Sequence, residues 1–199
     1  MKISIIGGGG LVGSNAAFAF QMAGVGSELV LVDANTQMAA GQALDLLHGA
    51  SYTSPQRIVS GGYDLVEGSE FVVITAGLRR KPDESRLDLI NRNVQLFQGI
   101  LEELRKVALP KNCTILVVTN PVDILTHLAV QKLGLDVDKW KSDYNSEAVN
   151  SAFFTRRDQA ASDQVNQTPT FIITGPKGTK TLVGAVNPSE FDDAIAEVQ

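Results

Sequence analysis

The fold of the first part of the chain is decided by the stretch ISIIGGGGLVG at residues 3–13. Residues 3–6 form an apolar run typical of a buried strand, and residues 11–23 have the pattern of a helix. A glycine-rich turn at this junction lets backbone N–H groups approach a pyrophosphate, whose charge the helix N-terminus favours. The stretch therefore predicts a dinucleotide-binding turn built on Gly7, Gly10 and Gly13.

Asp33 stands at the end of the next predicted strand, residues 28–32, twenty positions after Gly13. A carboxylate at this point can accept hydrogen bonds from ribose hydroxyls and repels an additional 2′-phosphate. Asp33 therefore favours NAD over NADP as the cofactor. The alternative interpretation is a glycine-rich turn followed by a solvated aspartate; the strand, the helix and Asp33 in register favour the cofactor site.

Strand and helix patterns continue to alternate up to about residue 135, which is typical of a parallel sheet covered by helices. The sequence predicts parallel strands in the order 3-2-1-4-5. The further predicted strands are residues 57–60, 71–75 and 114–118, and the further helices are residues 36–48, 87–107 and 121–133.

The pattern changes after residue 136, where a helix at 146–165 precedes two strands at 171–174 and 181–186. The sequence GPKG at 175–178 is a turn signal between these strands. Asn187 and Pro188 begin a last amphipathic helix. We therefore expect a dinucleotide-binding portion at 1–135 and a helix-hairpin-helix portion at 136–199. Together they predict a three-layer α/β/α fold in which the hairpin extends one continuous sheet.

The composition limits the classes of partner. The 199 residues carry a formal net charge of −5 and 44% hydrophobic side chains. The acidic balance argues against nucleic acid, and no apolar run approaches the roughly 20 residues of a membrane-spanning helix. The single cysteine, Cys113, forms no internal disulfide, which favours a cytoplasmic protein. We expect a small-molecule dinucleotide as the partner, no metal site, and an oligomer as a possible state.

Several motifs together resemble the malate and lactate dehydrogenase family. They are GGGGLVG at 7–13, LVD at 31–33, ALDL at 43–46, ITAG at 74–77 and VTNPVD at 118–123. The resemblance implies that NAD contacts Thr75, Ala76 and Gly77, that Asn120 lies on the nicotinamide side, and that the Asn120–Pro121 bond is cis. A helix cap is the simpler role for Asn120, and both roles are compatible.

The sequence RRKPDESRLDL at 79–89 is similar to the mobile substrate loop of that family. The resemblance implies that Arg80 selects dicarboxylic substrates and that Arg86 polarises the reacting carbonyl. Independently of the family, Arg79, Lys81 and Arg92 add positive charge where a small carboxylate can bind. The alternative is a solvated basic loop.

A proton donor for 2-oxo acid reduction is not matched in the sequence. In the family this donor is a histidine oriented by an aspartate, and this chain has only His48 and His127. His48 precedes Gly49 at a helix end, where a capping role is expected. Asp123 and His127 lie four residues apart on one helix, but an early-helix acid and a surface histidine explain them better.

The last segment resembles the C-terminal half of DsbA-like thioredoxin-fold proteins. The resemblance rests on LDVDKW at 135–140, VNQTPTFI at 165–172, VGA at 183–185 and PSEF at 188–191. It implies a cis proline at Pro169. Thiol–disulfide exchange needs a second thiol, so we interpret Cys113 as a core residue.

Three functions are compatible with these residues. The favoured interpretation is a recombined or designed hybrid that keeps at most an NAD-binding half-site and has no catalysis. The first alternative is an NAD-dependent dehydrogenase of the malate or lactate type. The second is a structural scaffold without a ligand. Reduction of a 2-oxo acid distinguishes the first alternative, and NADH titration separates the other two.

Overall fold

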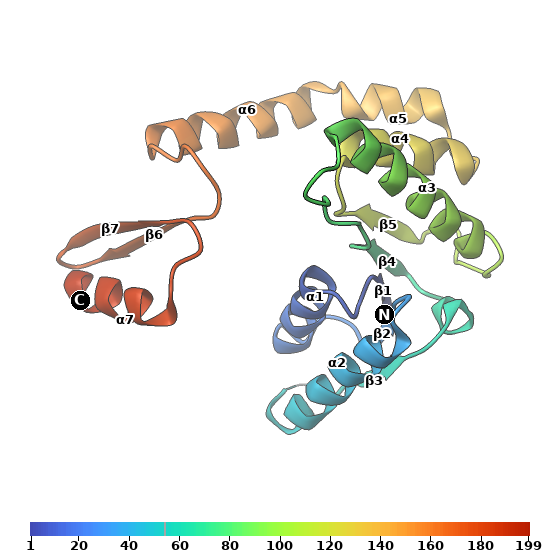
Figure 1. The fold of residues 1–199 in the computed structure, drawn as a ribbon, viewed down its shortest axis with the longest axis horizontal. Helices are drawn as coiled ribbons and strands as arrows, with labels where there is room; N and C mark the ends of the chain where they lie inside the picture. Colours follow the sequence, from blue (N-terminus) through green and yellow to red (C-terminus); the bar gives the residue numbers. More distant parts are fainter. Residues whose placement is uncertain (54) are drawn as a thin grey trace. The chain divides into compact units, whose positions relative to one another are not determined.

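The computed structural model describes residues 1–53 and 55–199, which divide into two compact units at 1–137 and 138–199. The first unit contains a five-stranded parallel sheet (Figure 1). Its strand order is β3-β2-β1-β4-β5, as the sequence predicts. The bounds are β1 Lys2–Ile6, β2 Glu28–Val32, β3 Arg57–Ser60, β4 Phe71–Ile74 and β5 Thr114–Val117.

Helices cover both faces of this sheet. The side chains of successive residues in β1 alternate, so that Ile5 packs with α1 and α2 while Ile6 packs with α3 and α4. Phe97 of α3 is 1% exposed, so its replacement by alanine costs about 3–5 kcal/mol. The helices are α1 Leu11–Met22, α2 Thr36–Gly49, α3 Arg86–Leu104 and α4 Val122–Lys132.

Two short 3₁₀ helices complete the first unit and were not predicted. The first, η1, spans Ala50–Tyr52, and the second, η2, spans Tyr63–Val66. Val66 of η2 is fully buried in the core beneath α3 and α4. The η2 turn therefore anchors the segment between β3 and β4, and it places Tyr63 at the end of the sheet.

The second unit holds an antiparallel hairpin and its covering helix. Strands β6, Thr170–Gly175, and β7, Gly178–Val183, pair throughout, and α7, Pro188–Val198, packs on them (Figure 1). Asn187 caps α7 and Pro188 is its first residue, as predicted, and Asn187 forms a capping box with Glu190. The ring of Phe171 meets that of Phe191 edge-on at 4.9 Å between centroids, which holds α7 against the hairpin.

Two predictions for the second part of the chain are wrong. Among the described residues, β6 and β7 form a sheet of their own instead of extending the parallel sheet. Pairing of the hairpin with β5 would be a long-range contact that no local pattern specifies. In addition, β7 begins at Gly178 rather than residue 181, because the two-residue turn Pro176–Lys177 is tighter than expected.

The helical part of the second unit is also more divided than predicted. Helix α5, Val137–Tyr144, begins at the boundary of the units and precedes α6, Glu147–Ser162. Ser146 starts α6, because its side chain accepts a hydrogen bond from the Val149 N–H. No helix in the described part of the chain is long and apolar enough to cross a membrane.

Candidate functional site

A cleft of about 470 Å³ lies at the carboxyl ends of β1, β2 and β4 in the first unit. Ligands of open parallel sheets bind at this end of the strands, where the strand order reverses. The cleft brings together most of the residues that the sequence singles out. Its lining includes Gly7, Gly10, Asp33, Thr75, Ala76 and Gly77, whereas Gly13 and Asn120 are outside the lining.

The glycine turn has a backbone geometry that requires glycine at two positions. Gly7 has φ of +93°, and a Cβ there would lie 2.6 Å from the Ala76 nitrogen. A Cβ on Gly13 would lie 2.2 Å from the Gly7 carbonyl oxygen. Gly13 therefore allows α1 to pack against the turn rather than forming part of the cleft wall.

Helix α1 begins directly after this turn and has no side-chain cap at its N-terminus. Gly10 occupies the cap position, and α1 has no acidic residue in its first turn. By contrast, Asn35 caps α2 and Ser85 caps α3 through side-chain oxygens. The first backbone N–H groups of a helix have no intrahelical partner, so the start of α1 can accept an anionic group.

The carboxylate of Asp33 is held in place by two backbone donors. The Gly9 N–H donates to its Oδ2 over 3.0 Å, and the Asn35 N–H donates to its Oδ1 over 2.9 Å. Asp33 is partly exposed at the cleft. Each carboxylate oxygen has a further lone pair that can accept a hydrogen bond from a hydroxyl group.

Tyr63 forms a wall of the cleft that sequence reasoning missed. It follows Gly61 and Gly62, which also line the cleft. Burial raises the pKa of Tyr63 to about 12, with smaller contributions from the negative charges of Glu103 and Asp33. The side chain is therefore a neutral phenol at physiological pH. Its only sequence signal is an aromatic residue directly after a glycine pair.

The segment after β4 is fixed by hydrogen bonds to neighbouring elements. The Thr75 hydroxyl donates to the Ile6 carbonyl over 3.1 Å. The Leu78 N–H donates to Oδ1 of the buried Asn93 over 2.7 Å. A Cβ on Gly77 would lie 2.4 Å from the Thr119 hydroxyl, so a side chain there would have to displace that hydroxyl group.

Asn120 lies at the end of the neighbouring strand, after Thr119. It is exposed, and its bond to Pro121 is cis, as the resemblance implies. Pro121, rather than Asn120, occupies the cap position of α4, so the expected capping role for Asn120 is wrong. The Thr168–Pro169 bond in the second unit is also cis.

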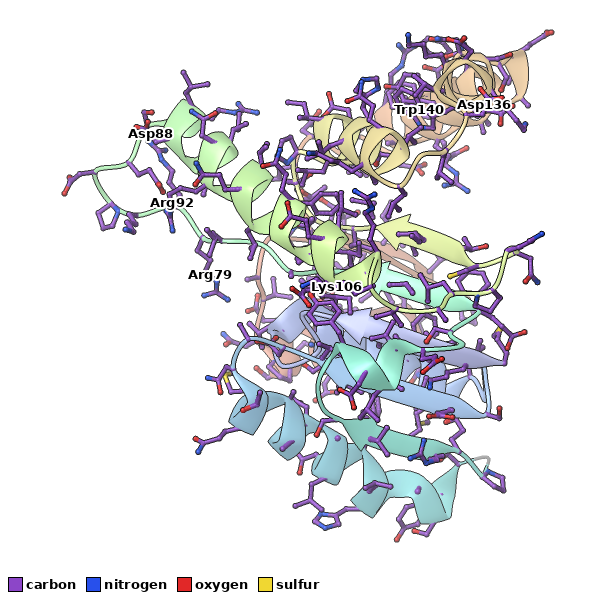
Figure 2. All side chains as sticks on the ribbon, turned by 90° about the vertical axis from the view of Figure 1, so that its right-hand side faces the viewer. Arg79, Asp88, Arg92, Lys106, Asp136 and Trp140 are labelled. Atoms are coloured by element: carbon purple, nitrogen blue, oxygen red, sulfur yellow. The ribbon has the colours of Figure 1, made fainter. Side chains whose placement is uncertain are left out.

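The basic loop between β4 and α3 places its arginines outside the cleft lining. Arg80 is exposed, and its Nε donates to the Glu84 carbonyl over 2.8 Å. Arg86 is exposed at the first position of α3. Figure 2 shows Arg92 extending from α3 toward the loop, where it forms an ion pair with Glu84. The hydrogen bond from the Arg92 guanidinium to the Glu84 carboxylate is the main reason that the pKa of Glu84 lies below its ordinary value.

The remaining candidates for proton or thiol chemistry lie elsewhere. Neither His48 nor His127 lines the cleft. His48 is exposed in the last turn of α2, and Asp123 is exposed in the first turn of α4, which agrees with roles at helix ends. Burial raises the pKa of the Cys113 thiol. No group of three potential metal-ligating side chains occurs among residues 1–53 and 55–199.

Comparison with protein families gives a match for each half of the chain. Residues 1–140 match the NAD binding domain of lactate/malate dehydrogenase. Residues 120–196 match the DSBA-like thioredoxin domain. Both resemblances predicted from the sequence motifs are confirmed, and the two matches overlap at 120–140.

Individual relatives come from the dehydrogenases. The chain is 47% identical over 133 residues to L-lactate dehydrogenase 1 of Clostridium acetobutylicum. It is 44% identical over 138 residues to an L-lactate dehydrogenase of Clostridium botulinum. These matches cover 67% and 69% of this chain, and 42% of each relative.

Solved structures agree with this assignment. A malate dehydrogenase from Archaeoglobus fulgidus in complex with NADH superimposes with a TM-score of 0.63 at 38% identity, over 68% of this chain and 46% of that one. A minor L-lactate dehydrogenase from Enterococcus mundtii superimposes with a TM-score of 0.66 at 27% identity, over 99% of this chain and 68% of that one. With its glycine turn, its Asp33 and its strand order, the chain belongs to the lactate/malate dehydrogenase family through the NAD binding domain.

Proposed function

We propose that this chain binds NAD in the cleft of its first unit and serves as the cofactor-binding part of a 2-hydroxy acid dehydrogenase. The observation that carries the proposal is the position of Asp33. Its carboxylate is anchored to the Gly9 N–H within the same cleft that the glycine turn lines. One site thus combines a turn for a pyrophosphate with an acceptor for ribose hydroxyls.

The residues of the cleft divide the recognition of the cofactor between them. The glycine turn and the uncapped start of α1 receive the pyrophosphate. Asp33 accepts hydrogen bonds from the ribose and repels a 2′-phosphate, so NAD is preferred over NADP. Bound NAD supplies the capacity to accept or donate a hydride. Thr75, Ala76 and Gly77, which follow β4, line the same cleft and would lie along the bound cofactor.

The basic loop supplies the proposed substrate contacts. The Nε of Arg80 donates to the Glu84 carbonyl, which leaves the two terminal amino groups of Arg80 to form a fork for a carboxylate. Arg86, at the first position of α3, provides a second positive charge directly after this loop. We therefore propose a dicarboxylic 2-oxo acid, together with the 2-hydroxy acid of the malate type to which it is reduced, as the substrate class.

A second function is favoured by the positions of the histidines. General acid catalysis requires the proton donor within hydrogen-bonding reach of the substrate oxygen. Neither His48 nor His127 lines the cleft. This observation supports cofactor binding without turnover by the chain itself. Separately, Leu44 and Leu47 of α2 are exposed apolar side chains. We predict that this face of α2 allows several copies of the chain to associate.

A titration of NADH followed by its fluorescence tests the proposal, with oxaloacetate added at each point to detect oxidation of NADH. The variants are Asp33→Ala and, as a control, Asp45→Ala at an exposed position of α2. Saturable binding that Asp33→Ala weakens and Asp45→Ala preserves supports the cofactor site. Turnover of oxaloacetate selects the dehydrogenase, and binding without turnover selects the second function. Absence of NADH binding to the unmodified chain contradicts both.

A further inference from the structure

Glu84 is the residue that joins the basic loop to α3. One side-chain oxygen, Oε1, pairs with the guanidinium of Arg92 on α3. The other, Oε2, accepts a hydrogen bond from the Lys81 N–H over 3.0 Å. The backbone of Glu84 adds two more contacts, because its N–H donates to the Lys81 carbonyl and its carbonyl accepts from Arg80 Nε.

These contacts distinguish Glu84 from its neighbours in the loop. Its side chain is 7% exposed, although Asp83 and Ser85 on either side are exposed. A carboxylate loses hydration when it is covered in this way, and the ion pair and the hydrogen bond replace that hydration. The loop conformation therefore depends on the charge of Glu84 and not only on the backbone.

The contacts also determine how Arg80 is presented. Donation from Nε to the Glu84 carbonyl fixes the plane of the guanidinium group. The edge formed by the two terminal amino groups is then directed away from that bond. An arginine prepared in this orientation loses less conformational freedom when it binds a carboxylate in two-point fashion.

We propose that Glu84 is a positioning residue that anchors the loop to Arg92 and orients Arg80 for the carboxylate of a dicarboxylic substrate. This role rests on the proposed function for its substrate part, whereas the anchoring part concerns the chain alone. Loss of the carboxylate charge should release the loop and make Arg80 a poorer ligand, with the cofactor cleft unchanged.

The anchoring part is tested by limited digestion with trypsin, which cleaves after Arg79 and Arg80 in an accessible loop. The products are identified by mass spectrometry. We expect Glu84→Gln to raise the cleavage rate about tenfold, because a charge-assisted contact is lost. Arg92→Gln should have a similar effect, and the double variant should add little to either single change. Asp83→Asn, at the exposed neighbouring position, is the matched control and should be cleaved like the unmodified chain.

The orienting part is tested by binding of malonate and propionate to the chain in the presence of NADH, followed by NADH fluorescence. Malonate, the dicarboxylate, should bind more tightly than propionate. Glu84→Gln should lower the affinity for malonate about tenfold and leave the affinity for NADH unchanged. Equal affinity for the two acids, or unaltered malonate binding by Glu84→Gln, overturns the orienting role. If trypsin cleaves Glu84→Gln at the same rate as the unmodified chain, the anchoring role of Glu84 is wrong. Failure of NADH to bind contradicts the proposed function and the orienting role, while the digestion still decides the anchor.

Discussion

The Gly9 N–H donates a hydrogen bond to Oδ2 of Asp33 over 3.0 Å, which joins the glycine turn to the end of β2. The two residues are separated by a helix in sequence, and the parallel pairing of β1 with β2 brings them together. The proposed acceptor for the ribose and the proposed cradle for the pyrophosphate are thus parts of one hydrogen-bonded unit. Changes at Asp33 should therefore disturb the glycine turn as well as the choice of cofactor.

The first prediction concerns cofactor choice. The unmodified chain should bind NADH more tightly than NADPH, because the Asp33 carboxylate repels a 2′-phosphate. Asp33→Ala should weaken NADH binding by about 10- to 100-fold, the range for hydrogen bonds to a charged group. The Asp33→Ala change should also reduce the difference between the affinities for NADH and NADPH. Fluorescence titrations with NADH and NADPH in parallel measure both effects, and an unchanged ratio would show that Asp33 does not discriminate.

The second prediction concerns the packing of α1 on the glycine turn. Gly13→Ala places a Cβ 2.2 Å from the Gly7 carbonyl oxygen, so the backbone must move. We expect the free energy of unfolding to fall by about 1–3 kcal/mol, as in other overpacked cores. Gly41→Ala is the matched control, because nothing lies within 4 Å of its added carbon on α2. Urea unfolding should show that Gly41→Ala is neutral or stabilising, by up to about 1 kcal/mol.

Local patterns determine much of this fold and less of its site. The β-branched run of β2 and the capping box of α7 could be predicted because they depend on neighbouring residues. Tyr63 could not be placed in the cleft, because it lines the cleft through a turn whose packing on α3 is a long-range effect. The role of Glu84 also depends on a residue one element away, Arg92, and charge spacing alone does not reveal it.

The third prediction concerns the pH dependence of the loop. The pKa of Glu84 is lower in the folded protein than its ordinary value of 4.5. Its stabilising contribution is therefore complete above pH 4.5 and is lost as the pH falls through the depressed pKa. Pulsed hydrogen exchange of residues 78–85 should show protection in the unmodified chain relative to Glu84→Gln at pH 7. The difference should vanish in acid while circular dichroism still reports a folded chain. A difference that persists after Glu84 is protonated would contradict this account.

The fourth prediction concerns Cys113. Burial raises the pKa of its thiol above the ordinary value of 9.0, so the reactive thiolate is scarcer than in an exposed cysteine. At pH 8, iodoacetamide should modify Cys113 more slowly than it modifies the thiol of glutathione. The rise of the Cys113 rate with pH should occur at a higher pH than that of glutathione. Reaction as fast as that of glutathione would instead indicate an activated nucleophile.

Binding of NADH to the unmodified chain and to Gly10→Ala tests the central claim most directly. A Cβ on Gly10 would lie 3.4 Å from the Gly7 carbonyl oxygen, an ordinary contact, and the backbone of Gly10 has φ of −78°, which alanine adopts readily. Gly10 nevertheless lines the cleft at the start of α1, where a methyl group would hold the pyrophosphate away from the backbone. The account predicts that Gly10→Ala keeps the thermal midpoint within a few degrees, corresponding to less than about 1 kcal/mol, and loses most of the NADH affinity. Equal NADH affinity of the two proteins would show that the cofactor does not bind at this turn.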